Sequence, residues 1–197
     1  MYTELKNLAI SSGVSAFGVG NIEDLRTRFE ALPADQTDGL SFAVSIGVQV
    51  SDSVLEGIII GPTRHYLHHY KMLNLLLDQT ALKIALAIQG RGYNALPIPA
   101  SQIVDWEKQT AHMSHKMAAV RAGLGWIGRN NLLVHPDLGS KIRLATVLTD
   151  MPLEMDSPVE RDCSGCKRCI EACPVSAIGE THEQWDKTAC LEKLKYF

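Results

Sequence analysis

Cysteine is concentrated near the end of the 197-residue chain, at a spacing that suits a metal cluster. All five cysteines lie after residue 162, and four of them fall within eleven residues, in the run Cys163-Ser-Gly-Cys166-Lys-Arg-Cys169-Ile-Glu-Ala-Cys173-Pro174. Gaps of two residues let consecutive thiolates surround one face of an iron cube, and the small residues Ser164 and Gly165 let the backbone approach its sulfides. Thiols this close together are poorly placed for disulfides between distant loops. The run therefore predicts a 4Fe-4S cluster, whose chemistry is electron transfer.

The order of the gaps, CxxCxxCxxxCP, is the one that bacterial ferredoxins use. A zinc site or unliganded cysteines are the alternatives, but zinc ribbons separate their two CxxC pairs more widely. In two-cluster ferredoxins the fourth cysteine of this run binds the other cluster, and the first cluster takes its last ligand from a distant segment. Here only Cys190 is available for that role, so either Cys173 or Cys190 completes the cluster. A second cluster would need more thiolates, from a longer native chain.

The chain ahead of the cysteine run mixes helical and strand periodicities, which predicts an α+β body. We expect helices at 2–12, 24–32, 66–88, 109–122 and 187–197, and strands at 14–19, 40–50, 93–99, 131–135 and 142–148. Pro97 and Pro99 place one strand at a sheet edge. The last two strands are joined by turn-rich sequence and could form a hairpin. A linker from Asp150 onward predicts two modules, a cofactor or substrate domain (1–155) and an iron–sulfur segment (156–197).

Composition places the chain among ordinary globular proteins, with 46% hydrophobic and 21% charged residues. The net charge of −3 gives no general attraction to phosphate backbones, so nucleic acid is not predicted as a partner. The N-terminus carries acidic Glu4 and lacks the basic start and long apolar core of a secretion signal. No apolar stretch approaches the ~20 residues that cross a bilayer. We therefore expect a cytoplasmic protein without a membrane span, and the oligomeric state stays open.

A second block lies upstream of the cysteines, in the run Ala122-Gly-Leu-Gly-Trp-Ile-Gly-Arg-Asn-Asn-Leu-Leu-Val, followed by Leu138-Gly-Ser140 and Ala145-Thr-Val-Leu-Thr-Asp150. With the cysteine run and Cys190, this order resembles epoxyqueuosine reductases and, more distantly, reductive dehalogenases. The resemblance implies a nitroreductase-like cobalamin-domain-type sheet with helices, then a ferredoxin-like module whose clusters pass electrons to cobalt. In that family a further CxxCxxxCP run completes a second cluster. That run is absent here, so we expect a shortened relative with an incomplete cluster module.

The glycines of the second block form a candidate cofactor site. Glycine permits tight turns or a close approach of the backbone to a flat ligand, although a helix-ending loop explains Gly123 and Gly125 equally well. The resemblance implies that the block lies near cobalamin, so the candidate cofactor-binding residues are Gly123, Gly125, Trp126, Gly128 and Arg129. For Trp126 a role as a core anchor is favoured over a stacking platform.

The candidate catalytic residues are Tyr70, His112 and His115. The resembled tRNA-modifying enzymes carry an Asp proton donor followed by a Glu-Arg pair; Gln109 stands at the Asp position here, with His115 and Lys116 at the pair. His112 or His115 could supply a proton instead, because imidazole titrates near neutral pH, although two histidines on a helix are more often packing residues.

Tyr70 belongs to the cluster His65-Tyr66-Leu67-His68-His69-Tyr70 at the start of the long predicted helix. By spacing, its three histidines could bind a divalent metal, contact a substrate or corrin, or form a solvated helix end. No nearby acid or cysteine supports the metal.

Two functions follow from these patterns. The first is a cobalamin-dependent reductase that takes electrons from a low-potential donor and passes them through the cluster to a corrin and a small or nucleoside-like substrate. The second is an electron carrier or partner-binding module without a substrate site. We favour the reductase because the body is larger than a simple ferredoxin requires. Gln109 makes epoxyqueuosine in tRNA a less expected substrate, and a flavin in place of cobalamin stays open.

Overall fold

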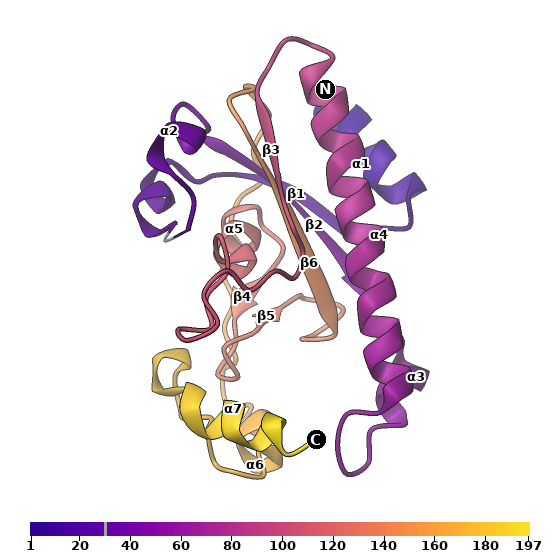
Figure 1. Ribbon diagram of the computed structural model, residues 1–197, viewed down its shortest axis with the longest axis vertical. Coiled ribbons are helices and arrows are strands. Elements are labelled where there is room, and N and C mark those ends of the chain that lie inside the picture. Colours follow the sequence, from indigo (N-terminus) through magenta and orange to yellow (C-terminus); the bar gives the residue numbers. More distant parts are fainter. Residues whose placement is uncertain (30) are drawn as a thin grey trace.

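The computed structural model describes residues 1–29 and 31–197 and has a four-stranded antiparallel sheet at its centre (Figure 1). The strand order is β1 (Ala16–Asn21), β2 (Phe42–Gln49), β6 (Ile142–Thr149) and β3 (Ala95–Ile98). The two central strands, β2 and β6, are buried along nearly their whole length, as their continuous apolar sequences predict. β3 lies at a sheet edge, which confirms the position expected from its prolines.

Helices cover both faces of this sheet. α1 (Tyr2–Ser11) and α4 (Arg64–Gln89) lie together on one face, and α5 (His115–Arg121) lies on the other (Figure 1). α4 buries one stripe of its surface against the sheet, and this core includes Leu73, Leu77, Ile84, Ile88, Val44, Ile46, Ala145 and Val147. On the opposite face, a Cβ on Gly18 of β1 would lie 2.0 Å from the carbonyl oxygen of Ala122. Glycine there lets the end of α5 lie directly on the sheet.

The remaining elements are short. They are the 3₁₀ turn η1 (Glu23–Arg28), α2 (Ala34–Thr37), α3 (Asp52–Glu56), the paired strands β4 (Trp126–Ile127) and β5 (Leu133–Val134), α6 (Arg168–Ala172), the 3₁₀ turn η2 (His182–Gln184) and α7 (Lys187–Lys195). α6 and α7 carry cysteines and lie beyond β4 and β5, at the end of the molecule where the chain stops (Figure 1). Within the described residues, no helix has the length and apolarity that a membrane span requires.

The predicted α+β class is confirmed, and the first helix, the long helix and the last strand lie within one to three residues of their predicted bounds. Thr63 caps the first turn of the long helix by accepting a hydrogen bond from the backbone N–H of Tyr66 at 3.0 Å, and Gly90 follows its last residue. By contrast, the helix predicted over 24–32 is replaced by the turn η1, and residues 34–37 form α2. Glu30, within that predicted helix, lies outside the described residues.

Two other predictions about these elements are wrong. The helix expected over 109–122 begins only at His115, because Asp105 accepts the backbone N–H groups of Glu107 and Lys108 at 2.9 Å and holds the preceding residues in a turn. The expected hairpin of the last two strands does not form, since β5 pairs with β4 while β6 pairs with β2 and β3. β6 is buried along nearly its whole length and satisfies its backbone on both edges by lying at the centre of the sheet.

The linker after β6 forms hydrogen bonds with residues near the N-terminus. Asp156 accepts the hydroxyl of Tyr2 at 2.9 and 3.0 Å and the backbone N–H of Val19 at 2.9 Å. Its own N–H donates to the carbonyl of Val19 at 2.8 Å. The segment that leads to the cysteines is therefore held against both α1 and β1.

Candidate iron–sulfur site and pocket

The five cysteines are free thiols on one end of the molecule. Cys163 and Cys166 occupy a turn closed by the N–H of Cys166 donating to the carbonyl of Cys163 at 2.9 Å. Cys169 lies in the short helix α6, Cys173 follows it directly, and Cys190 lies in α7. Cys166 is exposed and the others are half-buried. The short gaps thus keep Cys163, Cys166, Cys169 and Cys173 within one turn and the short helix that follows it.

The chemistry of these groups fits a 4Fe-4S cluster. Thiolates are the ligands that iron–sulfur clusters use, and backbone N–H groups that donate to sulfur stabilise them. The N–H of Ala177 donates to the sulfur of Cys173 at 3.2 Å. Ser164 and Ser176 have φ of +43° and +52°, so the backbone bends sharply beside Cys163 and Cys173. The segment has the sharp bends that a chain wrapping a cube needs.

The glycine block lies against protein backbone and the cysteine segment. A Cβ on Gly123 would lie 2.6 Å from the carbonyl oxygen of Ser157, and one on Gly125 would lie 2.1 Å from that of Val134. A Cβ on Gly128 would lie 3.6 Å from the sulfur of Cys163. These glycines therefore permit close approach of backbone segments to each other.

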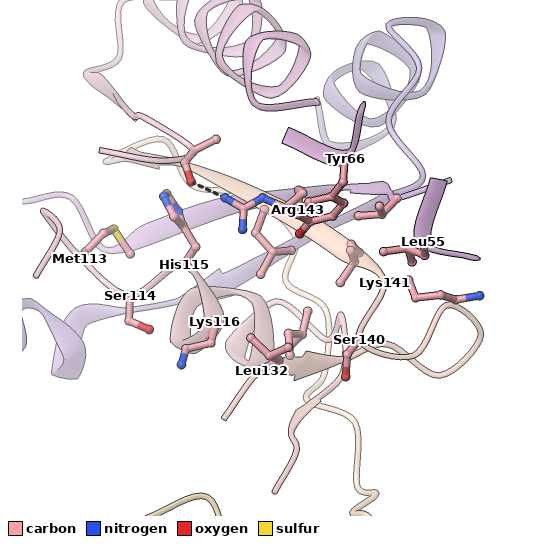
Figure 2. A pocket seen from close by; sticks show the side chains of 15 residues that line it. Leu55, Tyr66, Met113, Ser114, His115, Lys116, Leu132, Ser140, Lys141 and Arg143 are labelled. Atoms are coloured by element: carbon pink, nitrogen blue, oxygen red, sulfur yellow. Dashed lines mark hydrogen bonds between the residues drawn. The ribbon is translucent and has the colours of Figure 1, made fainter. Parts of the chain in front are cut away.

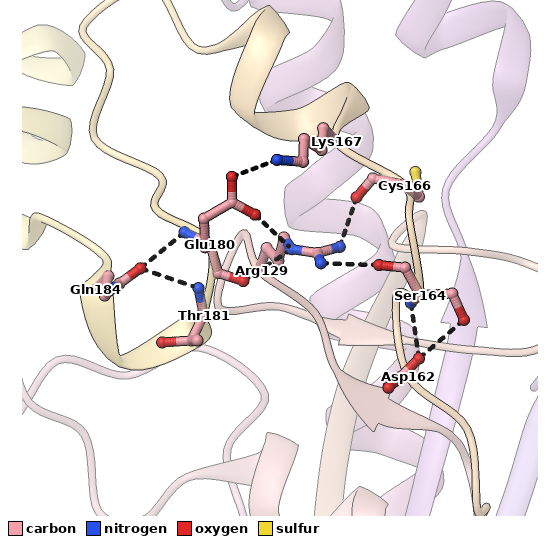
Figure 3. A network of polar contacts seen from close by, with 8 residues as sticks. All are labelled: Arg129, Asp162, Ser164, Cys166, Lys167, Glu180, Thr181 and Gln184. Carbon is pink, nitrogen blue, oxygen red and sulfur yellow. Dashed lines mark hydrogen bonds and ion pairs between the residues drawn. The ribbon is translucent and has the colours of Figure 1, made fainter.

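Trp126 and Arg129 complete the block. Trp126 is half-buried, its indole N–H has no hydrogen-bond partner within the described residues, and the guanidinium of Arg161 lies 5.6 Å from its ring centroid. Arg129 extends into the cysteine segment, where it donates to backbone carbonyls of Ser164, Cys166 and Glu180 (Figure 3). The block thus joins the α+β body to the segment that carries the thiols.

A cavity of about 560 Å³ opens between the start of α4, β6, α5 and β5 (Figure 2). Its volume falls in the range of small-molecule pockets, about 300–1,000 Å³. Apolar side chains form much of its wall, and seven residues add polar or charged groups; the lining residues are Val50, Leu55, Tyr66, Ala100, Met113, Ser114, His115, Lys116, Leu132, Leu133, Ser140, Lys141, Ile142, Arg143 and Leu144. Such a wall suits a largely apolar ligand with a few polar groups.

Arg143 supplies a cation to this pocket from the central strand β6. Its Nε donates to Asn74 Oδ1 at 3.2 Å and its Nη2 to the hydroxyl of Tyr70 at 3.0 Å. The guanidinium also lies 4.3 Å from the centroid of the Tyr70 ring. None of the ion pairs among the described residues includes Arg143 or Lys116, another cation of the lining. Lys141, the third cation of the lining, is paired with Asp52, so Arg143 and Lys116 are the pocket cations that have no paired carboxylate in the described part of the chain.

His115 lies in the wall of the pocket with both ring nitrogens occupied. We assign its Nε2–H as donor to the carbonyl of Pro99 at 2.9 Å, which leaves Nδ1 to accept from the hydroxyl of Thr146 at 2.8 Å. Burial lowers the pKa of His115, and the charge of Arg143 lowers it further, so the imidazole is neutral near pH 7. Burial also lowers the pKa of Lys116, whose ammonium donates to the carbonyl and side-chain oxygen of Asn131 at 2.5 and 3.0 Å.

The other candidate catalytic residues lie beside the pocket rather than in its lining. Tyr70 shares its hydroxyl with Ser101 at 2.8 Å and with Arg143. His112 Nε2 lies 3.1 Å from Gln102 Oε1. Gln109, at the expected acid position, lies in the turn before α5 and has φ of +53°. The catalytic roles of Tyr70, His112 and His115 stay predictions.

The three histidines at the start of α4 do not meet at one point. His65 and His68 are exposed, whereas His69 Nε2 accepts the backbone N–H of Ser51 at 3.1 Å. In the described part of the chain, no three side chains of His, Cys, Asp or Glu surround a position for a single metal ion. The metal interpretation of these histidines gains no support.

Sequence reasoning missed the role of Arg143, and it also missed Asn130 and Asn131, which link the glycine block to the pocket. One signal was present for Arg143: it is the only charged residue within the apolar strand β6, and a charge inside a buried strand usually has a function or a partner. No comparable signal marks the asparagines, because asparagine is common in turns and loops without any role in a site.

The fold and the cysteine segment define the class of protein. The family described as 4Fe-4S binding domain matches residues 158–179, which include four of the five cysteines and exclude Cys190. The chain thus carries a segment that matches a 4Fe-4S binding domain, placed after an α+β body.

The predicted resemblance to epoxyqueuosine reductases and reductive dehalogenases is confirmed. The chain is 38% identical to an epoxyqueuosine reductase of Bacillus cereus over 85 residues, which is 43% of this chain and 22% of that protein. Among solved structures, it is similar to the epoxyqueuosine reductase from Streptococcus thermophilus, with a TM-score of 0.63, 19% identity and coverage of 91% of this chain and 54% of that one. It is also similar to a catabolic reductive dehalogenase, with a TM-score of 0.73, 21% identity and coverage of 89% and 25%. The chain therefore shares their fold and spans about a fifth to a half of their lengths.

Proposed function

We propose that this chain is part of an iron–sulfur reductase in which a 4Fe-4S cluster passes single electrons to a group bound in the pocket. One observation carries the proposal: three consecutive residues connect the cysteine segment to the pocket wall. Arg129 donates to carbonyls of the cysteine segment. Asn130 donates to Ser140 at 3.1 Å, and Asn131 accepts from Lys116. Because Ser140 and Lys116 both line the pocket, the cluster and the pocket are held by one short stretch of chain.

The cluster would be held by Cys163, Cys166 and Cys169, with Cys173 or Cys190 as the fourth ligand. The N–H bond to Cys173 favours that residue as a thiolate. The modules 1–155 and 156–197 then correspond to a pocket-bearing body and a cluster-bearing segment.

We propose cobalamin as the group in the pocket, within a body of nitroreductase-like type. When bound, a corrin supplies low-valent cobalt chemistry that no side chain can provide. The largely apolar wall suits a large organic ring with polar substituents, and Arg143 and Lys116, which form no ion pair among the described residues, could bind those substituents. The glycine block would contribute from the cluster side, where Gly128 and Arg129 lie against the cysteine segment, and Gly123, Gly125 and Trp126 stay candidate cofactor contacts. A flavin is the alternative ligand of the same wall.

Protons for the reduction would come from groups beside the pocket. The hydroxyl of Tyr70 is bonded to Arg143, so it belongs to a network that reaches the pocket. His112 keeps one ring nitrogen without a partner among the described residues. His115 is neutral and bonded at both nitrogens, which suits positioning of the wall better than proton donation.

The substrate would be a small or nucleoside-like molecule, and a low-potential electron carrier in the cytoplasm would supply the electrons. The second candidate function is an electron carrier without a substrate site. The cavity of about 560 Å³ favours the reductase, because a carrier needs no pocket of that size.

A cobalamin titration tests the proposal. Anaerobic protein with a reconstituted cluster should change the absorption spectrum of added hydroxocobalamin to a saturable end point. The R143Q variant should bind several-fold more weakly, whereas R28Q, at an exposed arginine of η1, should bind as the parent does. An unaltered corrin spectrum at saturating protein would refute the cobalamin proposal and favour the electron carrier.

A further inference from the structure

The side chain of Arg129 is directed at the cysteine segment, where it donates three hydrogen bonds to backbone carbonyls. We propose that Arg129 is a positioning residue of the iron–sulfur cluster: its guanidinium fixes the loop of Cys163 and Cys166 on the α+β body and holds a positive charge beside the cluster. The inference rests on the cluster and is independent of what the pocket binds.

The guanidinium bonds to three carbonyl groups at once (Figure 3). Nη2 donates to the carbonyl of Ser164 at 2.8 Å, Nη1 to that of Cys166 at 2.6 Å, and Nε to that of Glu180 at 2.8 Å. The Arg129 side chain is only 17% exposed, so water competes weakly for these bonds. An arginine fork satisfied in this way fixes the distance between the loop 164–166 and residue 180.

The loop that Arg129 holds has a conformation that needs support. Ser164 has φ of +43°, a left-handed conformation that costs free energy for a residue with a side chain. Asp162 stabilises it by accepting the backbone N–H of Ser164 at 2.7 Å and its hydroxyl at 3.0 Å. Arg129 then takes the carbonyl of the same residue. Hydrogen bonds from Asp162 and Arg129 therefore fix the backbone of Ser164, and with it the directions of Cys163 and Cys166.

A second contact of the same block places Cys163. A Cβ on Gly128 would lie 3.6 Å from the sulfur of Cys163, so the thiol lies close to the backbone of the residue before Arg129. Glu180 closes the arrangement from the other side, because its carboxylate accepts Lys167 at 2.6 Å and lies 3.7 Å from Arg129 (Figure 3). Cys163 and Cys166 are thus positioned by residues 128 and 129 of the body.

The charge of Arg129 has a separate consequence for the cluster. A cube with four thiolate ligands is anionic, and the electron that reduces it adds a further negative charge. A partly buried cation nearby stabilises the reduced state more than the oxidised state, so it raises the reduction potential. Lysine would keep this charge but could not bond three carbonyls in fixed directions. The two effects of Arg129, position and charge, can therefore be separated by substitution.

Three variants of the anaerobically reconstituted chain test the proposal. R129Q removes both the positive charge and the hydrogen bonds of the guanidinium, whereas R129K keeps only the charge. R168Q is the control, because Arg168 is an exposed arginine between two of the cysteines. The readouts are iron and sulfide per chain, the rate at which an iron chelator bleaches the cluster, and the potential from a reductive titration followed by electron paramagnetic resonance. Far-ultraviolet circular dichroism establishes that each variant is folded.

We expect R129Q to lose its cluster at least about tenfold faster than the parent, because glutamine cannot replace all three hydrogen bonds and one hydrogen bond from a charged group already contributes about that factor. Its potential should fall, whereas R129K should keep a potential near that of the parent while losing the cluster faster. R168Q should match the parent in the loss rate. Parent-like loss rates and potentials in R129Q would overturn the proposal, as would R129K and R168Q behaving alike. If R129Q does not fold, R129K and R168Q still decide the outcome. Cobalamin takes no part in these measurements, so their failure is distinct from failure of the proposed reductase.

Discussion

Removing one hydroxyl at the N-terminus should measurably destabilise the whole chain. In the Y2F variant, Asp156 loses the hydroxyl that donates to its two carboxylate oxygens at 3.0 and 2.9 Å. The ring can stay in place, because its edge-to-face contact with Phe17, at 5.4 Å between centroids, does not involve the hydroxyl. The variant therefore isolates a single bond between α1 and the linker that leads to the cysteines.

The size of the effect follows from the charge of the acceptor and the exposure of the pair. Hydrogen bonds to charged groups contribute about 1.5–3 kcal/mol, and the partial exposure of Tyr2 favours the lower end. We expect Y2F to lower the free energy of unfolding by about 1.5 kcal/mol, close to a tenfold change in the folding equilibrium. Asp156 keeps the N–H of Val19, so its carboxylate is not left without a partner.

The difference in unfolding free energy between Y2F and the parent should vanish at high pH. Burial, followed by the hydrogen bond and negative charge of Asp156, raises the pKa of Tyr2 to about 12 from its usual 10.0. A raised pKa in the folded state means that the stabilisation is fully present below pH 10 and is lost as the pH rises through 12. The difference between Y2F and the parent should therefore shrink across that interval.

Urea unfolding followed by circular dichroism at pH 8 and at several higher pH values measures this difference. Y196F is the matched control, because Tyr196 is 81% exposed and should contribute little. Equal stability of Y2F and the parent at pH 8 would refute the reasoning, and so would a difference that persists unchanged above pH 12.

Three further predictions concern the site. G125A should destabilise the chain strongly, by about 3 kcal/mol or more, because its Cβ would lie 2.1 Å from the carbonyl oxygen of Val134; thermal unfolding measures this, and a parent-like midpoint would contradict it. C173S should lower the iron content of the reconstituted chain more than C190S, because Cys173 accepts a backbone N–H; the reverse order in iron analysis would assign the fourth ligand to Cys190. Finally, the lowered pKa of His115 means that its contribution to stability is present above about pH 6.5 and is lost as the pH falls, so the stability of H115Q should fall less steeply between pH 7 and 5. Equal slopes for H115Q and the parent would show that His115 does not carry this acid dependence.

Local patterns were sufficient for several elements and for the cluster segment. The long helix α4 follows from apolar residues at helical spacing between a capping threonine and a glycine, all within one stretch of chain. The cysteine run is equally local, since its short gaps alone keep four thiols within one short segment. Both features depend on residues near each other in sequence, so their physical causes can be read without the fold.

Other features depended on partners that the sequence does not reveal. The turn before α5 forms because one aspartate captures nearby N–H groups that a longer helix would have used. β5 pairs with β4 instead of β6, since β6 needs partners on both edges in the centre of the sheet. Helical periodicity predicted a longer helix, and turn-rich sequence predicted a hairpin. Both predictions were wrong because such patterns describe one segment without the other groups that compete for its hydrogen bonds.

The sequence by itself determined that thiols spaced for an iron–sulfur cluster follow an α+β body, because spacing along the chain limits which groups can share a ligand. Only the tertiary structure decided that the glycine block joins the body to those thiols. Arg129 and the carbonyls of Ser164 and Cys166 lie 35 and 37 residues apart in sequence, and their bonds exist only once the sheet and the linker have brought the two segments together. Directional bonds between distant residues depend on the position of every element between them, and no local pattern records that position.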